Sequence, residues 1–274
     1  DEPAGRRGLD QALSFIEAAQ RHPSGRLGGV VAPGQIDTCT EALLRDALDA
    51  ARERGLAFTT HASQSVIEFQ EMVRRHGLTP LQWADSIGLL GPETLLAHAI
   101  FIDEHSWLRW HTRRDLDLLA DRGARVAHCP LPFARYGAML EDLGRYLRRG
   151  VGVGLGTDTL PLNMLEEMRV ALMASHIAAR DVHAVDTGDI FHAATVGGAD
   201  ALRRDDIGRV APGARADLVL VDLDHPAMHP LRDPLRSLVY VAADRAVRDV
   251  YVDGRQVVAD RKVLTLDQAD AAGR

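Results

Sequence analysis

Several features that define other protein classes are scarce or missing in this sequence of 274 residues. It contains two cysteines, Cys39 and Cys129, which excludes the disulfide framework of small secreted domains. No apolar run approaches the length of a membrane-spanning helix, and the first residues lack the apolar stretch of a secretory signal. We therefore expect a cytoplasmic protein that has no membrane partner.

A strongly basic stripe is missing as well. The chain has 32 Lys and Arg against 39 Asp and Glu, a formal net charge of -7, and both signs are mixed along its length. Nucleic-acid-binding surfaces need clustered basic residues, so we expect no nucleic-acid partner. An initiator methionine is also absent, and we expect the sequence to begin inside a longer protein. A composition of 46% hydrophobic and 26% charged residues is ordinary for a globular protein with a sizeable core.

Four short apolar runs end on residues that can bind a metal or move protons. The runs are residues 57–61, 94–98, 124–129 and 152–158, and they carry His61, His98, His128 and Asp158. They recur about every 30 to 40 residues, and each is followed by a helical pattern, which is the rhythm of βα units. Such runs are typical of buried parallel strands, whose carboxyl ends carry the catalytic groups of (β/α) barrels. The pattern predicts a site built from His and Asp, most simply a metal site.

The number of expected strands is too small for a closed barrel, which needs eight. The five expected strands end near Ala32, His61, His98, Cys129 and Asp158. We interpret residues 1–206 as an α/β domain containing part of a (β/α)₈ TIM-like barrel. The turn dipeptide Asp253-Gly254 predicts a β-hairpin, so residues 207–266 are expected to form a small β domain. Residues 267–274 are expected to be a frayed tail.

Together these segments resemble the amidohydrolase superfamily, in the branch of cytosine, guanine and adenosine-type deaminases and s-triazine hydrolases such as atrazine chlorohydrolase. The resemblance covers residues 8–260 and apparently lacks the family's N-terminal part. It is carried by Leu96-Ala97-His98, Val126-Ala127-His128-Cys129-Pro130, Leu155-Gly156-Thr157-Asp158 and the segment from Gly208 to Leu218. It implies strands four to eight only of the barrel, followed by the C-terminal part of a small β-sandwich.

The resemblance also implies a role for three of the strand-end residues. His61 matches a metal ligand after the fifth strand. His98 matches the residue that polarises the leaving group or orients the hydrolytic water. Asp158 matches a carboxylate that binds the metal and accepts a proton from its water. One divalent metal is therefore implied, with zinc as the default and iron fitting similar ligands.

The sequence departs from the family pattern at three places. No two of the twelve histidines form the expected His-x-His pair. Gln64 stands where deaminases carry a proton-shuttling Glu, and an amide cannot shuttle protons, so Gln64 is expected to contact substrate or bound water. Residues 130–133 are expected to form a Pro-rich loop, and within it Pro132-Phe133 replaces a Ser-Asn pair, which predicts a less polar edge of the substrate site at Phe133.

Other residues keep two interpretations each. His128 is either a substrate or supporting contact or a core histidine. Trp107 either forms a wall of the substrate site or packs within its own loop. Glu68 is expected on a solvated helix face, with a substitute proton shuttle as the alternative. Glu166 and Glu167 are expected to be structural.

The implied activity is hydrolysis of a C–N bond, or a C–Cl bond, on a nitrogen heterocycle such as a purine, pterin, pyrimidine or s-triazine. A metal-activated hydroxide would attack a ring carbon and expel ammonia, an amine or chloride. The alternative is a truncated or inactive barrel homologue that binds a ligand or partner without catalysis. We expect the full-length protein to be a homo-oligomer and this chain alone to be inactive.

Overall fold

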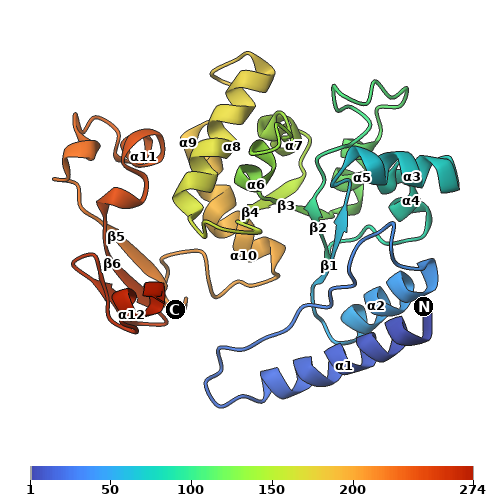
Figure 1. Ribbon diagram of the computed structural model, residues 1–274, viewed down its shortest axis with the longest axis horizontal. Coiled ribbons are helices and arrows are strands. Elements are labelled where there is room, and N and C mark those ends of the chain that lie inside the picture. The colour runs from blue at the N-terminus through green and yellow to red at the C-terminus, as the bar shows by residue number, and fades with distance from the viewer. Residues whose placement is uncertain (1, 274) are drawn as a thin grey trace.

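The computed structural model describes residues 2–273, apart from the side chains of residues 268 and 269, and its centre is a parallel sheet (Figure 1). The strands are β1 (Phe58–Ala62), β2 (Thr94–His98), β3 (Arg125–His128) and β4 (Gly152–Leu155). They pair in the order β1-β2-β3-β4, and each pair is parallel. The connecting helices are α3 (Val66–His76), α4 (Pro80–Ser86), α5 (Asp115–Arg122), α6 (Pro130–Ala134) and α7 (Leu143–Arg148). The four strands predicted from residues 57 to 158 are confirmed, and their carboxyl ends share one edge of the sheet.

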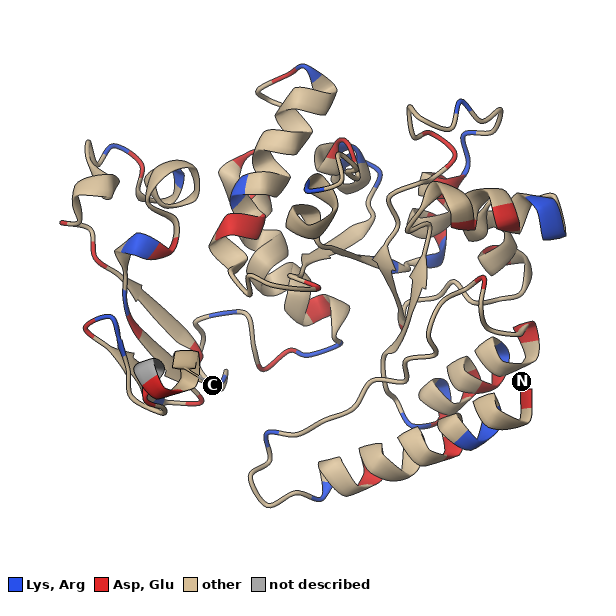
Figure 2. Cartoon of the chain, viewed as in Figure 1, with Lys and Arg blue, Asp and Glu red and all other residues tan. Residues whose placement is uncertain are grey.

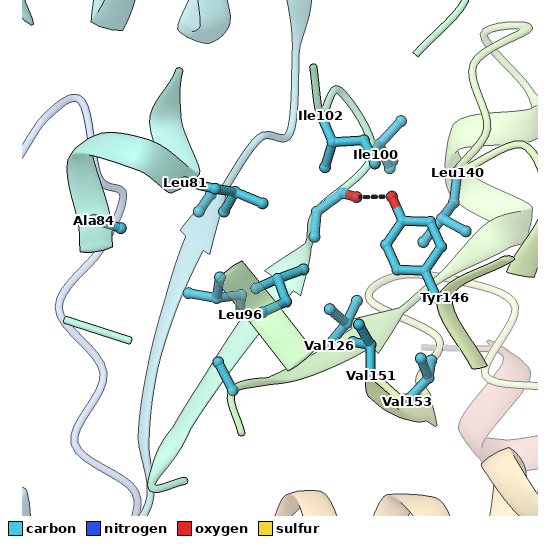
Figure 3. Close-up of a cluster of buried hydrophobic side chains, with 14 of the residues drawn as sticks. Leu81, Ala84, Leu96, Ile100, Ile102, Val126, Leu140, Tyr146, Val151 and Val153 are labelled. Atoms are coloured by element: carbon cyan, nitrogen blue, oxygen red, sulfur yellow. Dashed lines mark hydrogen bonds between the residues drawn. The ribbon is translucent and has the colours of Figure 1, made fainter. Parts of the chain in front are cut away.

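The sheet is held by an aliphatic core with one buried aromatic hydroxyl. Leu96, Val126 and Val153, from three adjacent strands, are all buried in this core (Figure 3). Tyr146 of α7 is fully buried beside them, and its hydroxyl donates a 2.7 Å hydrogen bond to the carbonyl of Ala99. Because a buried hydroxyl is costly without a partner, this bond fixes the position of Ala99 just beyond β2.

The first expected strand, ending at Ala32, was wrong as an element. Helices α1 (Glu2–Gln20) and α2 (Glu41–Glu53) flank an extended segment that makes only two isolated parallel bridges, Val31 with Phe58 and Gln35 with His61. A side chain at Gly29 would lie 2.4 Å from Ile16 of α1, so the backbone here packs on a helix. Pro33 has no N–H to give to a ladder. The segment therefore runs along β1 without becoming a full strand.

A run of helices after β4 packs directly on that strand. It comprises α8 (Met164–Ala179), α9 (Thr187–His192), the π-helix η1 (Ala193–Gly197) and α10 (Gly198–Ala201). A Cβ atom at Gly197 would lie 2.4 Å from the carbonyl oxygen of Val153. One at Gly154 would lie 3.0 Å from the Cα of Gly198. Helix and strand backbones therefore touch at a place where only hydrogen atoms fit.

A second sheet near the C-terminus is antiparallel, in the order β5-β6-β7-β8. Its strands are β5 (Leu218–Val221), β6 (Val247–Val252), β7 (Arg255–Ala259) and β8 (Lys262–Val263). The predicted hairpin is confirmed: Asp253 and Gly254, between β6 and β7, have φ of 52° and 75°. The short helices nearby are η2 (Pro226–Met228), α11 (Pro234–Ser237), η3 (Leu238–Ala242) and η4 (Ala243–Ala246). The tail includes the short helix α12 (Gln268–Gly273).

Charge is spread over the helices. Figure 2 shows basic and acidic residues near one another on most of them, with little charge on the strands of the parallel sheet. Within residues 2–273, none of the helices combines the length and the apolar character that crossing a bilayer requires.

Candidate active site

Three histidines mark the carboxyl ends of adjacent strands. His61 lies in β1, His98 ends β2 and His128 ends β3. The parallel register sets Ala62 opposite His98, so the first two rings meet with their centroids 5.3 Å apart. Asp158 is exposed and lies three residues beyond Leu155, the last residue of β4. The fold therefore brings these sequence-predicted residues to one edge of the sheet.

The ring of His61 is oriented by the extended segment before α2. Its Nδ1 lies 2.7 Å from the carbonyl oxygen of Gly34. A carbonyl can only accept, so Nδ1 carries the proton and Nε2 keeps its lone pair. This is the tautomer in which a histidine can act as a metal ligand through Nε2. Sequence reasoning missed Gly34, whose contact depends on a bridge between Gln35 and His61 rather than on any local motif.

His98 combines burial with an unusual backbone conformation. It is 3% exposed, its Nδ1 has no hydrogen-bond partner, and its φ is 80°. Burial lowers its pKa to about 4, with a raising contribution from the charge of Asp158 and a lowering one from His61. The ring is therefore neutral near pH 7, with one nitrogen that can donate a hydrogen bond and one that can accept. The ring of Phe133, on α6, packs against His98 in an edge-to-face arrangement, with the two ring centroids 4.6 Å apart.

His128 is as buried as His98. It is buried, its Nδ1 lacks a hydrogen-bond partner, and burial together with the neighbouring His98 lowers its pKa to about 3. The segment after it, expected as a Pro-rich loop, is the short helix α6. Pro130 fits the first turn of that helix because the missing N–H is not needed there. This helix is what brings Phe133 against His98.

The exposed carboxylate of Asp158 acts electrostatically on several buried groups. Its charge raises the pKa of Glu167, whose main cause of elevation to about 7 is burial. Glu167 accepts a 2.8 Å hydrogen bond from the N–H of Leu131, while its other oxygen has no partner. The structural role expected of Glu167 agrees with the Leu131 contact. No local pattern in the sequence predicts that Glu167 lies near Asp158, because the loop before α8 separates the two residues along the chain.

The expectation that Glu68 lies on a solvated helix face was wrong. The Glu68 side chain is 1% exposed and accepts from the N–H groups of Ser63 at 2.6 Å and Gln64 at 2.7 Å. Burial raises its pKa to about 7. The spacing Ser65-x-x-Glu68 is a helix-capping pattern that could have indicated an inward-facing carboxylate. Gln64 itself is half-buried, directly after β1.

Trp107 lies in an environment different from that of the strand-end histidines. It is 57% exposed, and its ring contacts Phe101 and His105 at centroid distances of 5.7 and 5.6 Å. With Glu141 and Arg145 it lines a cavity of about 580 Å³. The structure therefore does not bring Trp107 against His98 in the way it brings Phe133, and a substrate wall at Trp107 stays a prediction.

The donor set fits part of a metal site. His61 offers a free Nε2 and Asp158 an exposed carboxylate, while the orphaned Nδ1 of His98 lies beside them. A catalytic zinc ordinarily has three protein ligands. Over the part of the chain that the structure describes, no group of three or more His, Cys, Asp or Glu side chains is arranged to hold a metal ion. The assignment of His61 and Asp158 as two ligands of one metal therefore stays a prediction.

Comparison with known proteins identifies relatives of this chain by sequence. The model of the Amidohydrolase family matches residues 10–257. A 5-methylthioadenosine/S-adenosylhomocysteine deaminase of Natronomonas pharaonis is 35% identical over 271 residues, which is 97% of this chain and 61% of the relative. A 5′-deoxyadenosine deaminase of Methanothermobacter thermautotrophicus is 33% identical over 95% of this chain and 60% of its own length. The chain thus spans less than two thirds of these relatives.

Solved structures agree on the fold. An adenosine deaminase from Xanthomonas campestris, crystallised with bound zinc, has a TM-score of 0.86 and 26% identity, covering 96% of this chain and 59% of that one. The atrazine chlorohydrolase of Arthrobacter aurescens, complexed with zinc, has a TM-score of 0.86 at 22% identity, over 98% of this chain and 59% of that one. At that identity the second likeness concerns the fold.

Proposed function

This chain belongs to the amidohydrolase family, and we propose that it carries the hydrolytic residues of an enzyme that cleaves a C–N bond on a nitrogen heterocycle. The observation that supports this best is His98. A neutral, buried imidazole with an unpartnered nitrogen is held in a left-handed backbone conformation beside His61 and within the field of Asp158. Such perturbed and strained groups gather at functional sites.

Each residue of the site has a proposed role that follows from the chemistry of its side chain. His61 and Asp158 would hold one divalent cation, zinc in preference to iron, with the remaining ligand supplied from outside the described residues. A bound zinc ion is a Lewis acid that makes water nucleophilic near neutral pH. Asp158 is exposed and ionisable, so it is the proton acceptor in this proposal. His98, kept neutral by burial, donates a hydrogen bond from its ring N–H to the departing group.

The proposed substrate class rests on the names of the relatives. The relatives at 35% and 33% identity are named as deaminases of adenosine derivatives that differ at the 5′ position. We therefore favour a 6-aminopurine nucleoside, with ammonia as the leaving group, over a triazine with chloride. The ring of Phe133 would lie against the heterocycle, and Gln64 would hydrogen-bond to it. His128 would support His98 from behind.

Gln64 makes the proton route different from that of a Glu-containing deaminase. The side-chain amide can donate and accept hydrogen bonds but cannot carry a proton between water and a ring nitrogen. In this proposal Gln64 orients the heterocycle, and Asp158 takes the proton from the water and passes it to the departing ammonia.

The wider architecture is part of the same proposal. Strands β1 to β4 would be strands five to eight of a (β/α)₈ barrel, with residues 31–35 in the place of the fourth. The boundary near residue 206 would separate this barrel part from a portion of a small β-sandwich. A homo-oligomeric, cytoplasmic enzyme stays a prediction.

The test is an assay of the complete natural polypeptide containing this chain, supplied with zinc. Purified enzyme is incubated with 5′-methylthioadenosine, S-adenosylhomocysteine and 5′-deoxyadenosine, and ammonia release is measured together with the adenine-to-hypoxanthine change in absorbance. We expect turnover of at least one nucleoside and its loss in His98→Asn. Glu71→Gln is the matched control, because Glu71 pairs with Arg74 and Arg75 on the outer side of α3. Equal activity of His98→Asn and wild type would contradict the proposal.

A binding protein without catalysis is the second candidate. It is favoured by an apolar groove of about 1540 Å³ lined by residues of β4, α8, α9, β5 and β6, among them Leu155, Met168 and Val250. Zinc-loaded complete polypeptide that binds the nucleosides in calorimetry but releases no ammonia would support this candidate instead.

A further inference from the structure

The backbone at the ends of β1 and β2 is strained. His98 and Ala99 have φ of 80° and 44°, and Ser63, one residue beyond β1, has φ of 54°. Residues other than glycine seldom adopt this left-handed region, and they stay there only where surrounding contacts hold them. The position of the His98 ring therefore depends on what restrains these two turns.

The two turns restrain each other through backbone hydrogen bonds. The N–H of Ala99 donates to the carbonyl of Ala62 at 3.0 Å. The N–H groups of Ile100 and Phe101 both donate to the carbonyl of Ser63, at 2.9 and 2.8 Å. The Ser63 peptide thus holds the segment that follows His98, and whatever fixes Ser63 also fixes the turn after β2.

Ser63 is fixed by the buried carboxylate of Glu68. One oxygen accepts from the N–H of Ser63 at 2.6 Å and the other from the N–H of Gln64 at 2.7 Å. Hydrogen bonds to a charged acceptor are stronger than neutral ones. Both oxygens are used, and the side chain is 1% exposed, so water does not compete for them.

Helix capping alone does not account for this geometry. In a capping box, the glutamate three residues after the cap reaches back to the N–H of the capping residue. Here Ser65 caps α3 with its own hydroxyl, which accepts from the N–H of Glu68 at 3.1 Å. The two short hydrogen bonds of the carboxylate go past Ser65, to residues that lie outside the helix.

A second anchor holds the other turn. The hydroxyl of Tyr146 donates to the carbonyl of Ala99 at 2.7 Å, inside the aliphatic core (Figure 3). Ala99 and Tyr146 are both buried, so this bond is also shielded from water.

We propose that Glu68 is a positioning residue: through Ser63 it sets the turn that carries His98, with Tyr146 as the opposing anchor. The role in catalysis rests on the function proposed above, whereas the role in backbone positioning can be measured independently. Glu68 touches no reacting atom in this proposal.

Amide hydrogen exchange on the metal-free complete polypeptide tests the positioning, at a pH above the Glu68 pKa of about 7, where the carboxylate is ionised. Glu68→Gln keeps the size of the side chain but turns one acceptor into a donor that faces an N–H group. We expect exchange at Ile100 and Phe101 to accelerate by about tenfold or more, as for loss of a buried hydrogen bond to a charged group. Exchange at Val126 in β3 should change less than about twofold, since it lies outside the two turns. Glu71→Gln, on the same helix, is the matched control and should leave all three amides unchanged.

Two outcomes would overturn the positioning role. One is unchanged exchange at Ile100 and Phe101 in Glu68→Gln. The other is an equal acceleration at Val126, which would mean that Glu68 only stabilises the whole fold. If Glu68→Gln does not fold, Tyr146→Phe takes its place with the same three amides and the same criteria, because it removes the opposing anchor.

Kinetics of the complete zinc-loaded polypeptide separate this inference from the proposed function. A positioning role predicts that Glu68→Gln lowers kcat by about tenfold or more while KM stays within about twofold. Turnover unaffected by the substitution would overturn the link to His98. A wild-type protein without turnover would refute the proposed function, while the exchange result would still decide the positioning.

Discussion

His128 should make folding sensitive to acid, because its ring is buried and neutral at the end of β3. Burial and the adjacent His98 lower its pKa to about 3, whereas an unfolded histidine titrates near 6.5. Between these values the unfolded chain binds a proton that the folded chain does not. The stabilising contribution is therefore complete above pH 6.5 and is lost as the pH falls toward 3.

The size of the effect follows from the two pKa values. From pH 7.5 to pH 4, linkage gives a loss of about 3 kcal/mol of unfolding free energy from this one ring. Glu68 and Glu167, with pKa raised to about 7 by burial, act in the opposite direction, since the folded state takes up their protons first. The pH profile of the wild type alone therefore does not isolate His128.

The difference between wild type and His128→Gln does isolate it, because glutamine does not titrate. Urea unfolding, followed by far-ultraviolet circular dichroism in the presence of a chelator, gives the free energy of each protein from pH 7.5 to 4. We expect the stability advantage of the wild type to shrink by about 3 kcal/mol over that range. His183→Gln, at an exposed position, controls for the exchange of residue type and should change stability by less than about 0.5 kcal/mol. A difference that is constant with pH would refute the reasoning.

Three further predictions concern the proposed chemistry. Asp158→Asn in the complete enzyme should abolish turnover but change the urea midpoint little, because the side chain is exposed; near-wild-type rates with zinc present would rule out the proton acceptor. Gln64→Glu should raise ammonia release from aminated heterocycles, because glutamate can still accept a hydrogen bond and can also carry a proton; a general fall in activity would show that the amide N–H of Gln64 is required as a donor. The 274-residue chain by itself should retain little zinc after dialysis and show no turnover, since His61 and Asp158 supply two ligands where three are usual; stoichiometric metal with clear catalysis would reveal a ligand not recognised here.

The elements that the sequence predicts well are those specified locally. The short runs before His61, His98 and His128 form strands, as expected for largely apolar stretches that alternate with helices around a parallel sheet. The β6–β7 hairpin formed as expected because Asp253 and Gly254 accept a left-handed backbone.

The failures come from contacts between distant segments. The run ending at Ala32 has strand composition, but its backbone is held by Ile16 and by two bridges to β1, which no local pattern encodes. Glu68 has the charge of a surface residue, yet the turn after β1 folds back over it. Phe133 approaches His98 only because residues 130–134 form a helix where prolines suggested a loop.

The contact between η1 and β4 has a consequence for reading genetic data. Gly197 lies in a helix with no residue of the proposed site, yet any side chain there would meet the carbonyl of Val153 and push the strand that leads to Asp158. Inactivating variants should therefore accumulate at positions 154 and 197 as readily as at the histidines. In a mutational scan scored by activity, this helix–strand seam would look like a second catalytic centre, although it holds no chemistry of its own.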